Sequence, residues 1–331
     1  MARLRRRREF EELRGRSPLQ DAFRRLFKHR AATAGGVFVI LLVLVALFVD
    51  TTIPAAIFGW ETRPLIAPKH YAETSFFERD LPPGTPGFPL GTDYLGRDIL
   101  SRTLYGTRVS LSVAVVAATV ALIVGLTYGV ISGFAPPGVD NAMMRFVDFL
   151  YGFPLLIFII LLQALFKAIS RRGATGFVGM MVGIDKALGG MFFLFVALGI
   201  LNWIGMARLA RGQTLSVKQK EYIESARALG AGNLRIVFRH VLPNIIGPCI
   251  VSETLAIPGY ILTEAFLSFI GLGVTPPTPS WGLMISETYQ GIRTYPWETL
   301  VPGGALAMTT LAFNFLGDGL RDAFDPRLRG T

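Results

Sequence analysis

Long hydrophobic runs without charge alternate with charged segments along the chain. A helix that crosses a bilayer needs about 20 mostly apolar residues, and six runs come close to this length or exceed it. These runs are Ala31–Val49, Val109–Phe134, Phe149–Phe166, Ala187–Ala207, Val241–Gly271 and Thr299–Gly317. A further run, Gly173–Ile184, is too short to span and predicts an interfacial or re-entrant piece. The pattern therefore predicts an all-α integral membrane protein with six transmembrane helices.

The composition is typical of a membrane protein, and the residue types present argue against disulfides, metal sites and catalytic motifs. Of the 331 residues, 51% are hydrophobic and 17% are charged, whereas soluble domains carry about 25% charged residues. The single cysteine, Cys249, excludes an internal disulfide, and three scattered histidines do not indicate a metal site. The sequence has no Gly-x-x-x-x-Gly-Lys-Ser/Thr loop and no credible nucleophile–base pair. We therefore expect no catalytic residue, no metal site and no cofactor bound by this chain.

The basic residues are distributed unevenly between the segments that connect the predicted spans. Lysine and arginine are about twice as frequent in the segments on the side of the N-terminus as in those on the other side, and cytoplasmic segments show this bias. Both termini are therefore predicted to be cytoplasmic, with 1–33 as a basic N-terminal segment and 326–331 as a C-terminal tail. The basic N-terminal segment favours contact with membrane lipid, and we expect no nucleic acid as a partner.

The largest predicted cytoplasmic loop, 208–240, has a helical pattern of its own. At 100° per residue, Lys220, Glu221, Glu224 and Arg227 share one face, and an apolar face holds Tyr222, Ile223, Ala226 and Leu229. Gly230 and Gly232 then predict the end of this helix, because glycine ends helices at little cost. Asn233 is predicted to cap a second helix with the apolar stripe Leu234, Val237, Phe238 and Val241. Such an element could present a charged face to a cytoplasmic partner, or it could be a solvated linker.

The amino-acid sequence of this loop resembles that of a known family. "EYIESARALGAGNLRIVFRHVLPN" (221–244) resembles the EAA loop of ABC-importer permeases in Glu224, Ala226, Gly230, Leu242 and Pro243. Ser225 replaces the middle alanine of that pattern and His240 its isoleucine. The resemblance implies that the first helix docks in a groove of an ATPase subunit. The residues that it assigns to ATPase coupling are Glu221, Glu224, Ser225, Ala226, Arg227 and Gly230.

Two further stretches narrow the resemblance. "GTDYLGRDILSRTLYGTRVSLSV" (91–113) and "LTEAFLSFIGLGVTPPTPSWG" (262–282) are similar to signatures of dipeptide/oligopeptide permease subunits of the second-permease type. The link Lys167–Gly190 departs from the family because it is longer than usual. The resemblance implies a type I ABC-importer permease core over 90–325, preceded by a first transmembrane helix and an extracytoplasmic loop over 34–89.

The resemblance also implies the setting in which such a subunit works. It would be a permease subunit of an ATP-driven, binding-protein-dependent importer of peptides or a related small solute, and would form half of the translocation pathway in the plasma or inner membrane. Its partners would be a homologous second permease, two ATPase subunits or domains and an extracytoplasmic substrate-binding protein. ATP and magnesium would be bound by the ATPases.

Two carboxylates inside the fifth predicted span support a rival class of protein. Glu253 and Glu264 are separated by about three helical turns, so they share one face, and Pro258 between them predicts a kink. A carboxylate at the bilayer centre costs about 2.5–3.5 kcal/mol on insertion scales and is often functional. One interpretation places both in the translocation pathway or at a subunit interface; the other has a neighbouring helix cap them for structural reasons. A proton-coupled secondary transporter or a membrane enzyme would use them directly.

Small and acidic residues near the second span predict local packing. Gly125, Gly129 and Gly133 recur at helical spacing and indicate close contact with another helix. Asp93 is predicted to cap the helix that carries Arg97 and Arg102.

Overall fold

The computed structural model describes residues 26–52, 63–172 and 175–324. Within these ranges the chain forms helices, turns and loops without a β-strand. The predicted tails, 1–25 of the basic N-terminal segment and 326–331, lie outside the described residues. The helices are α3 (Arg30–Phe48), α5 (Ile99–Phe134), α6 (Pro137–Tyr151), α7 (Leu155–Arg172), α8 (Gly176–Ala187), α9 (Phe192–Lys218), α10 (Glu221–Ala228), α11 (Asn233–Ile236), the π-helical turn η1 (Val237–Val241), α12 (Leu242–Phe269), α13 (Trp281–Thr288), the 3-10 turn η2 (Tyr289–Gly291) and α14 (Pro296–Phe324).

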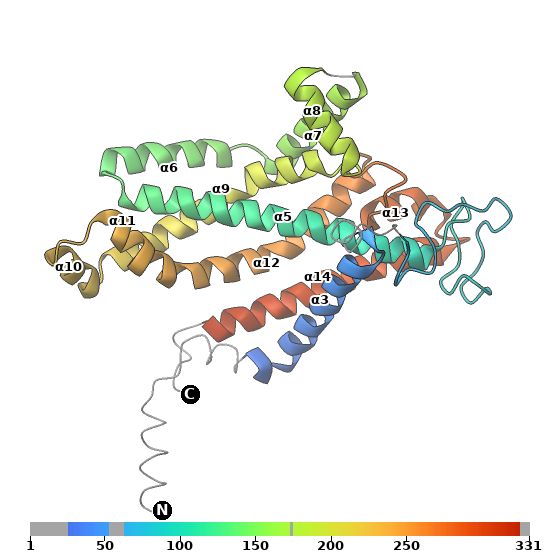
Figure 1. Ribbon diagram of the computed structural model, residues 1–331, viewed down its shortest axis with the longest axis horizontal. Coiled ribbons are helices and arrows are strands. Elements are labelled where there is room, and N and C mark those ends of the chain that lie inside the picture. The colour runs from blue at the N-terminus through green and yellow to red at the C-terminus, as the bar shows by residue number, and fades with distance from the viewer. Residues whose placement is uncertain (1–25, 53–62, 173–174, 325–331) are drawn as a thin grey trace, which may run out of the picture.

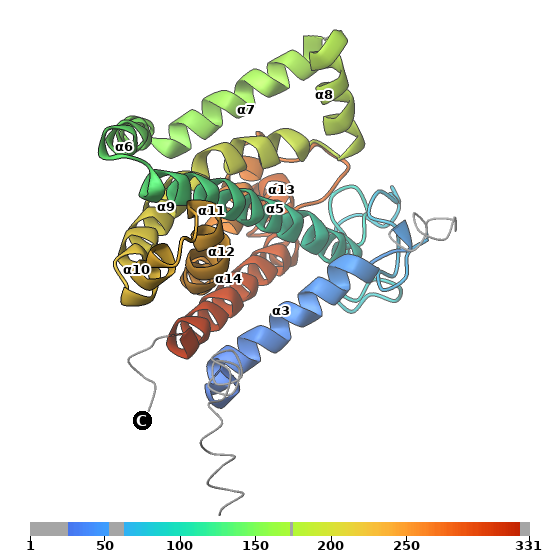
Figure 2. The ribbon, with the colours of Figure 1, turned by 60° about the vertical axis from the view of Figure 1, so that its left-hand side comes forward.

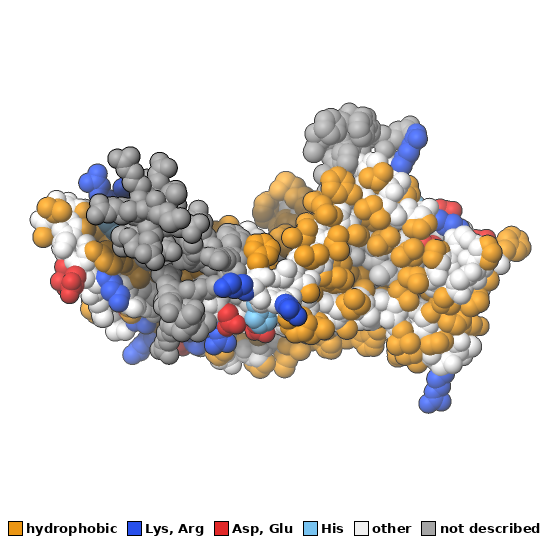
Figure 3. All heavy atoms as spheres, turned by 90° about the horizontal axis from the view of Figure 1, so that it is seen from below, with side chains coloured by type: hydrophobic (Ala, Val, Ile, Leu, Met, Phe, Trp, Pro, Cys, Tyr) orange, Lys and Arg blue, Asp and Glu red, His pale blue; other side chains and the backbone are white. Residues whose placement is uncertain are grey.

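Most of the long helices share one direction. Figure 1 shows α5, α9, α12 and α14 along the long axis of the molecule, with α10 and α11 at one end and the loop 63–98 with α13 at the other. We call these the α10 end and the α13 end. Figure 3 shows hydrophobic side chains over most of the underside toward the α13 end, whereas charged side chains gather toward the α10 end. A broad apolar surface of this kind is expected where helices face lipid.

Five helical segments in the described residues are long and apolar enough to cross a membrane. They are α3, α5, α9, the continuous segment Asn233–Phe269 and α14; the pair α6–α7, bent by 77°, makes a sixth if it is one span. The predicted all-α membrane fold is confirmed. The predicted third span, Phe149–Phe166, was wrong in its bounds because it runs across the bend. Pro154 at the bend lacks a backbone N–H, and the residue before a proline disfavours helical geometry.

Several helices extend beyond the charge-free runs that predicted them. α9 continues to Lys218 instead of ending at Ala207, and the fifth segment begins at Asn233 instead of Val241. Much of the predicted loop 208–240 is therefore helix. Apolar runs indicate where a helix crosses lipid, but a helix can continue into water with its charged side chains exposed. The predicted short run Gly173–Ile184 corresponds to α8, and Gly189 and Gly190, with φ of +64° and +84°, separate α8 from α9.

The three predicted packing glycines lie in the contact between α5 and α9. A Cβ on Gly129 would come within 2.4 Å of the carbonyl oxygen of Ala207, and one on Gly125 within 2.6 Å of the Cβ of Met206. Gly133 lies as close to Thr214. The predicted helix contact is confirmed, and only glycine allows the two backbones to approach this closely.

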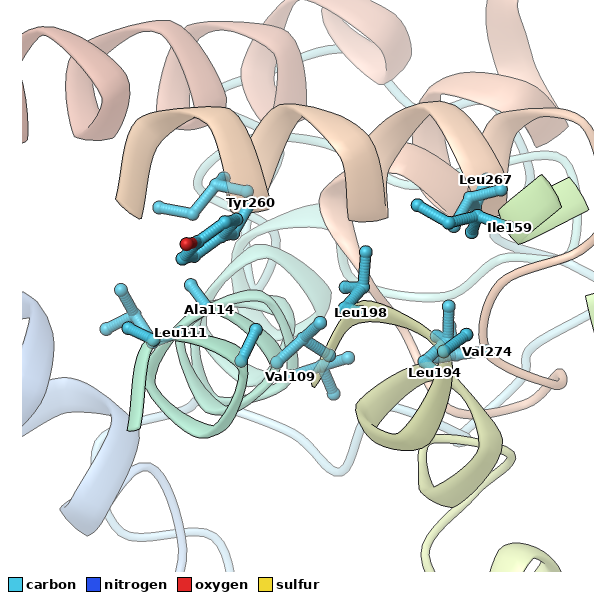
Figure 4. Packing of buried hydrophobic residues seen from close by; sticks show 14 of the residues in the cluster. Val109, Leu111, Ala114, Ile159, Leu194, Leu198, Tyr260, Leu267 and Val274 are labelled. Atoms are coloured by element: carbon cyan, nitrogen blue, oxygen red, sulfur yellow. The ribbon is translucent and has the colours of Figure 1, made fainter. Parts of the chain in front are cut away.

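The main core joins α5, α9 and α12. Figure 4 shows Val109, Leu111 and Ala114 of α5 facing Leu194 and Leu198 of α9 and Tyr260 and Leu267 of α12. This packing holds α9 and α12, the two helices that lead into and out of the α10 end, against one common helix.

Candidate functional site: the coupling loop and buried charges

The predicted coupling residues lie on α10 and at its end. The side chains of Glu221, Glu224, Ser225 and Arg227 are exposed, and Ala226 is half-buried. Among the described residues, neither glutamate forms an ion pair. Both glutamates lie in the first turn, where a carboxylate interacts favourably with the helix dipole. The Ser225 hydroxyl donates to the carbonyl oxygen of Glu221 at 3.0 Å, so it is turned back onto its own helix. α10 therefore presents free acidic side chains to a potential partner.

One side chain anchors α10 to the bundle. Ile223 is fully buried in a cluster with Val217 of α9, Ile236 of α11, Val241 and Ile245. Of the apolar face predicted for this helix, only Ile223 is fully buried; Tyr222 is 44% exposed and Leu229 is 89% exposed. A helix of this length at a loop tip has room for one anchoring residue against the bundle. Its other apolar side chains remain available at the surface.

Gly230 ends α10, as the sequence predicted. Its φ of +85° lies in the left-handed region that favours glycine. The N–H of Gly230 donates to the carbonyl of Arg227 at 2.9 Å, and that of Ala231 donates to Ala226 at 3.0 Å. This pair of hydrogen bonds is a Schellman motif, which satisfies the last carbonyls of the helix and fixes the direction of the chain that follows.

The second helix of the loop starts differently from the prediction. Gly232 is the cap residue, whereas Asn233 is the first residue of α11 and makes no capping hydrogen bond. Leu234 and Phe238 are 75% and 68% exposed, so the predicted apolar stripe is only partly buried. With the end of α5, including Val130 and Phe134, they line an apolar groove of about 550 Å³. The α10 end thus combines exposed acids with an apolar groove.

An ion-paired junction ties α9 to α6 and to the end of α5. The Nε and Nη2 of Arg211 donate to Oδ1 and Oδ2 of Asp140, each at 2.6 Å. The Ser132 hydroxyl also donates to Asp140, and Lys218 donates to the carbonyl of Gly133 at 3.0 Å. Sequence reasoning missed this junction because Asp140 and Arg211 lie 71 positions apart and each resembles an isolated surface charge.

The two carboxylates of α12 are both largely buried. Glu264 is fully buried, and it accepts hydrogen bonds from Ser110 of α5 at 2.9 Å and from Ser268 at 2.7 Å. Glu253 is 7% exposed and accepts from the hydroxyl of Tyr260 at 3.0 Å. The enclosure of Glu264 favours the structural interpretation for that residue, and placement in the pathway stays a prediction for both. In the parts of the chain that the structure describes, no group of three or more His, Cys, Asp or Glu could hold a metal ion.

A buried charge network lies at the α13 end. Asp93 accepts from Arg97 at 2.7 Å and also from Arg102, and Glu287 of α13 accepts from the same arginines at 3.0 and 2.8 Å. The prediction that Asp93 caps α5 was wrong: Asp98 is the cap and accepts from the N–H of Ser101 at 2.8 Å. The network joins the first signature stretch to α13 through Glu287. A run of charged residues in the sequence does not by itself reveal that the side chains are buried.

The chain matches two protein-family models and several known proteins. Residues 125–330 match the family model of the binding-protein-dependent transport system inner membrane component. Residues 17–83 match the N-terminal TM domain of oligopeptide transport permease C. The chain is 40% identical over 319 residues to the oligopeptide transport system permease protein OppC of Escherichia coli (strain K12), which covers 96% of this chain and 94% of that protein.

Relatives that are named for other cargoes are similar as well. The dipeptide transport system permease protein DppC of Bacillus subtilis (strain 168) is 39% identical over 311 residues, or 94% of this chain and 86% of that protein. The glutathione transport system permease protein GsiD of Pectobacterium atrosepticum is 35% identical over 316 residues, or 95% of this chain and 93% of that protein. The resemblance read from the signature stretches is confirmed.

Proposed function

The chain belongs to the family of binding-protein-dependent transport system inner membrane components. On this basis we propose a class of cargo for it and a partner for its coupling loop. It is a multi-pass membrane permease subunit of an ABC-type importer and not itself an enzyme. The comparisons do not favour a proton-coupled secondary transporter or a membrane enzyme.

The proposed cargo is a peptide or a related small solute. The names of the relatives, which include oligopeptide, dipeptide and glutathione permeases, support this class. The chain would form half of the pathway, and a homologous second permease the other half. Two ATPase subunits, with ATP and magnesium, and an extracytoplasmic binding protein complete the assembly.

The proposed ATPase contact is α10. The observation that supports it is the free, exposed pair Glu221 and Glu224 on a helix that Ile223 anchors and Gly230 orients. An exposed charged face beside an apolar groove is expected of a surface that binds a protein partner, and is less expected of a solvated linker. In the assembled importer, closure of the ATPases would move α10, and α9 and α12 would move with it. ATP would then act by favouring one of two arrangements of the bundle.

The pathway residues form a second part of the proposal. Glu253, with its small exposed fraction, is proposed to face the pathway or the second permease. Glu264 is proposed to hold α12 against α5 through Ser110 and thereby to set the position of Glu253 on the same helix.

The test of the ATPase contact is Glu224→Lys in the assembled transporter. The reversed charge is expected to lower co-purification of the ATPase subunits and to lower peptide uptake in parallel, while the amount of permease in the membrane stays unchanged. The matched control is Glu73→Lys, an exposed acid at the α13 end, which is expected to retain the ATPases. Normal ATPase retention and uptake in Glu224→Lys would contradict the docking proposal and leave 219–232 as a solvated linker.

A further inference from the structure

The helix α8 has no counterpart in the function described so far. It has 12 residues, which is too short to cross a bilayer. Figure 2 shows α8 running from the outer end of α7 down to the start of α9, apart from the main bundle. Along the chain, α8 therefore lies between α7, the second half of the bent α6–α7 pair, and the candidate span α9.

Two hydrogen bonds hold the segments on either side of α8 at the α13 end. The N–H of Thr275, in the link before α13, donates to the carbonyl of Gly189 at 3.0 Å. Lys167 of α7 donates to the carbonyl of Gly271, at the end of α12, at 2.9 Å. The segment thus lies at the level where α12 leaves the membrane.

One face of α8 is apolar and has no partner among the described residues. Phe177, Met180 and Ile184 are 72%, 57% and 38% exposed, and their spacing places them in a single stripe. Val182 and Asp185 are buried on the opposite side, toward the protein. α7 also carries exposed apolar side chains, which include Ile157, Leu161 and Leu165.

Exposed basic side chains lie at both ends of α8. Arg171 and Arg172 end α7, before α8 begins, and Lys186 lies in the last turn of α8. Asp185 is the one acid between Lys167 and Gly190. Asp185 faces inward, where its carboxylate accepts from the N–H of Phe193 at 3.2 Å. Burial raises the pKa of the Asp185 carboxyl group above its ordinary value.

We propose that α8 with Arg171, Arg172 and Lys186 forms an interfacial anchor that binds anionic phospholipid headgroups, its apolar stripe inserted among the upper acyl chains. A helix with an apolar stripe and cationic side chains beside it lies in the plane of the interface. Anionic phosphodiesters complement these basic side chains, and the long arginine side chains can extend to the headgroups. The assignment to the outer leaflet rests on the proposed orientation, but the lipid contact itself does not.

The first experiment measures the surroundings of the stripe in the assembled transporter in lipid nanodiscs. An environment-sensitive probe is attached at Phe177→Cys in a Cys249→Ser background, and the control probe is at Phe77→Cys on the loop 63–98, a fully exposed position. Spin-labelled lipids with a shallow label are expected to quench the probe at 177 and not the probe at 77. Protection of position 177 by the second permease, or by added binding protein, would show a protein interface and overturn the proposal.

The second experiment measures lipid selectivity. Arg171→Gln with Arg172→Gln is expected to lower retention of phosphatidylglycerol relative to phosphatidylcholine, by about fivefold for each charge near the surface. Arg293→Gln, at another exposed arginine of the α13 end, is the control and should leave the ratio unchanged. Equal retention in both variants would overturn the proposal. These readouts use no transport measurement, so their failure would be distinct from failure of the α10 contact.

Discussion

At the scale of single residues, Gly230 shows how backbone conformation serves the loop. Its Cβ position is open, with nothing within 4 Å, so only its φ of +85° restricts substitution. A β-branched residue there would cost about 1–2 kcal/mol and redirect α11. Gly230→Val is therefore expected to lower the thermal stability of the purified subunit and to reduce ATPase retention. Gly232→Val, at an equally open position with a φ of −69°, is the control and should have a much smaller effect.

For Glu264, the structural role and the pathway role predict opposite effects of substitution. Its carboxylate accepts from Ser110 and Ser268, and a glutamine would keep a carbonyl acceptor in the same place. If the residue holds α12 against α5, Glu264→Gln should retain normal assembly and uptake. Glu264→Ala should lower the amount of assembled protein, because a buried donor without a partner costs about 1–3 kcal/mol. Quantified membrane protein and uptake distinguish the cases: low uptake with normal assembly in Glu264→Gln would support the pathway prediction.

At the scale of elements, the sequence predicts which segments are helices better than where they end. Charge-free runs identified the spans, and Gly230 marked the end of α10 because its conformation is a local property. The end of α9 was missed because Arg211 and Lys218 are compatible with a helix that leaves the membrane. The bounds of α12 agree with the predicted fifth span to within two residues, although the continuous helical segment that contains it begins earlier, at Asn233. The α6–α7 bend could have been found from Pro154. The contacts Arg211–Asp140 and Arg97–Glu287 join distant elements and required the fold.

The two ion pairs between α6 and α9 allow a matched test of how α6 is held. Arg211–Asp140 is half-buried and doubly hydrogen-bonded, whereas Arg208–Asp148 is exposed at both side chains. Asp140→Asn is expected to weaken the attachment by about 1–3 kcal/mol, because Arg211 loses its charged acceptor. Asp148→Asn should cost at most about 1 kcal/mol. In proteoliposomes, we expect Asp140→Asn to retain the ATPases but to transport less peptide per ATP hydrolysed than Asp148→Asn. Equal ratios would restrict the junction to a local structural role.

At the scale of the whole molecule, the α10 end and the α13 end must lie on opposite sides of the membrane. Figure 1 separates them by the length of α5, which has 36 residues and spans about 54 Å at 1.5 Å per residue, more than the hydrocarbon thickness of a bilayer of about 30 Å. Each end therefore reaches water. The basic bias of the sequence then predicts which end is inside.

The orientation can be measured with single cysteines in a Cys249→Ser background. Ser216, near the end of α9, and Arg293, after η2, are both exposed and lie toward the α10 end and the α13 end respectively. A membrane-impermeant maleimide is expected to label Arg293→Cys in intact cells and Ser216→Cys only after permeabilisation, because cytoplasmic segments carry the excess of lysine and arginine. Thr74→Cys, on the loop 63–98, should behave like Arg293→Cys since both belong to the α13 end. Labelling of Ser216→Cys in intact cells would reverse the orientation, and α10 would then be out of reach of any ATPase in the cytoplasm.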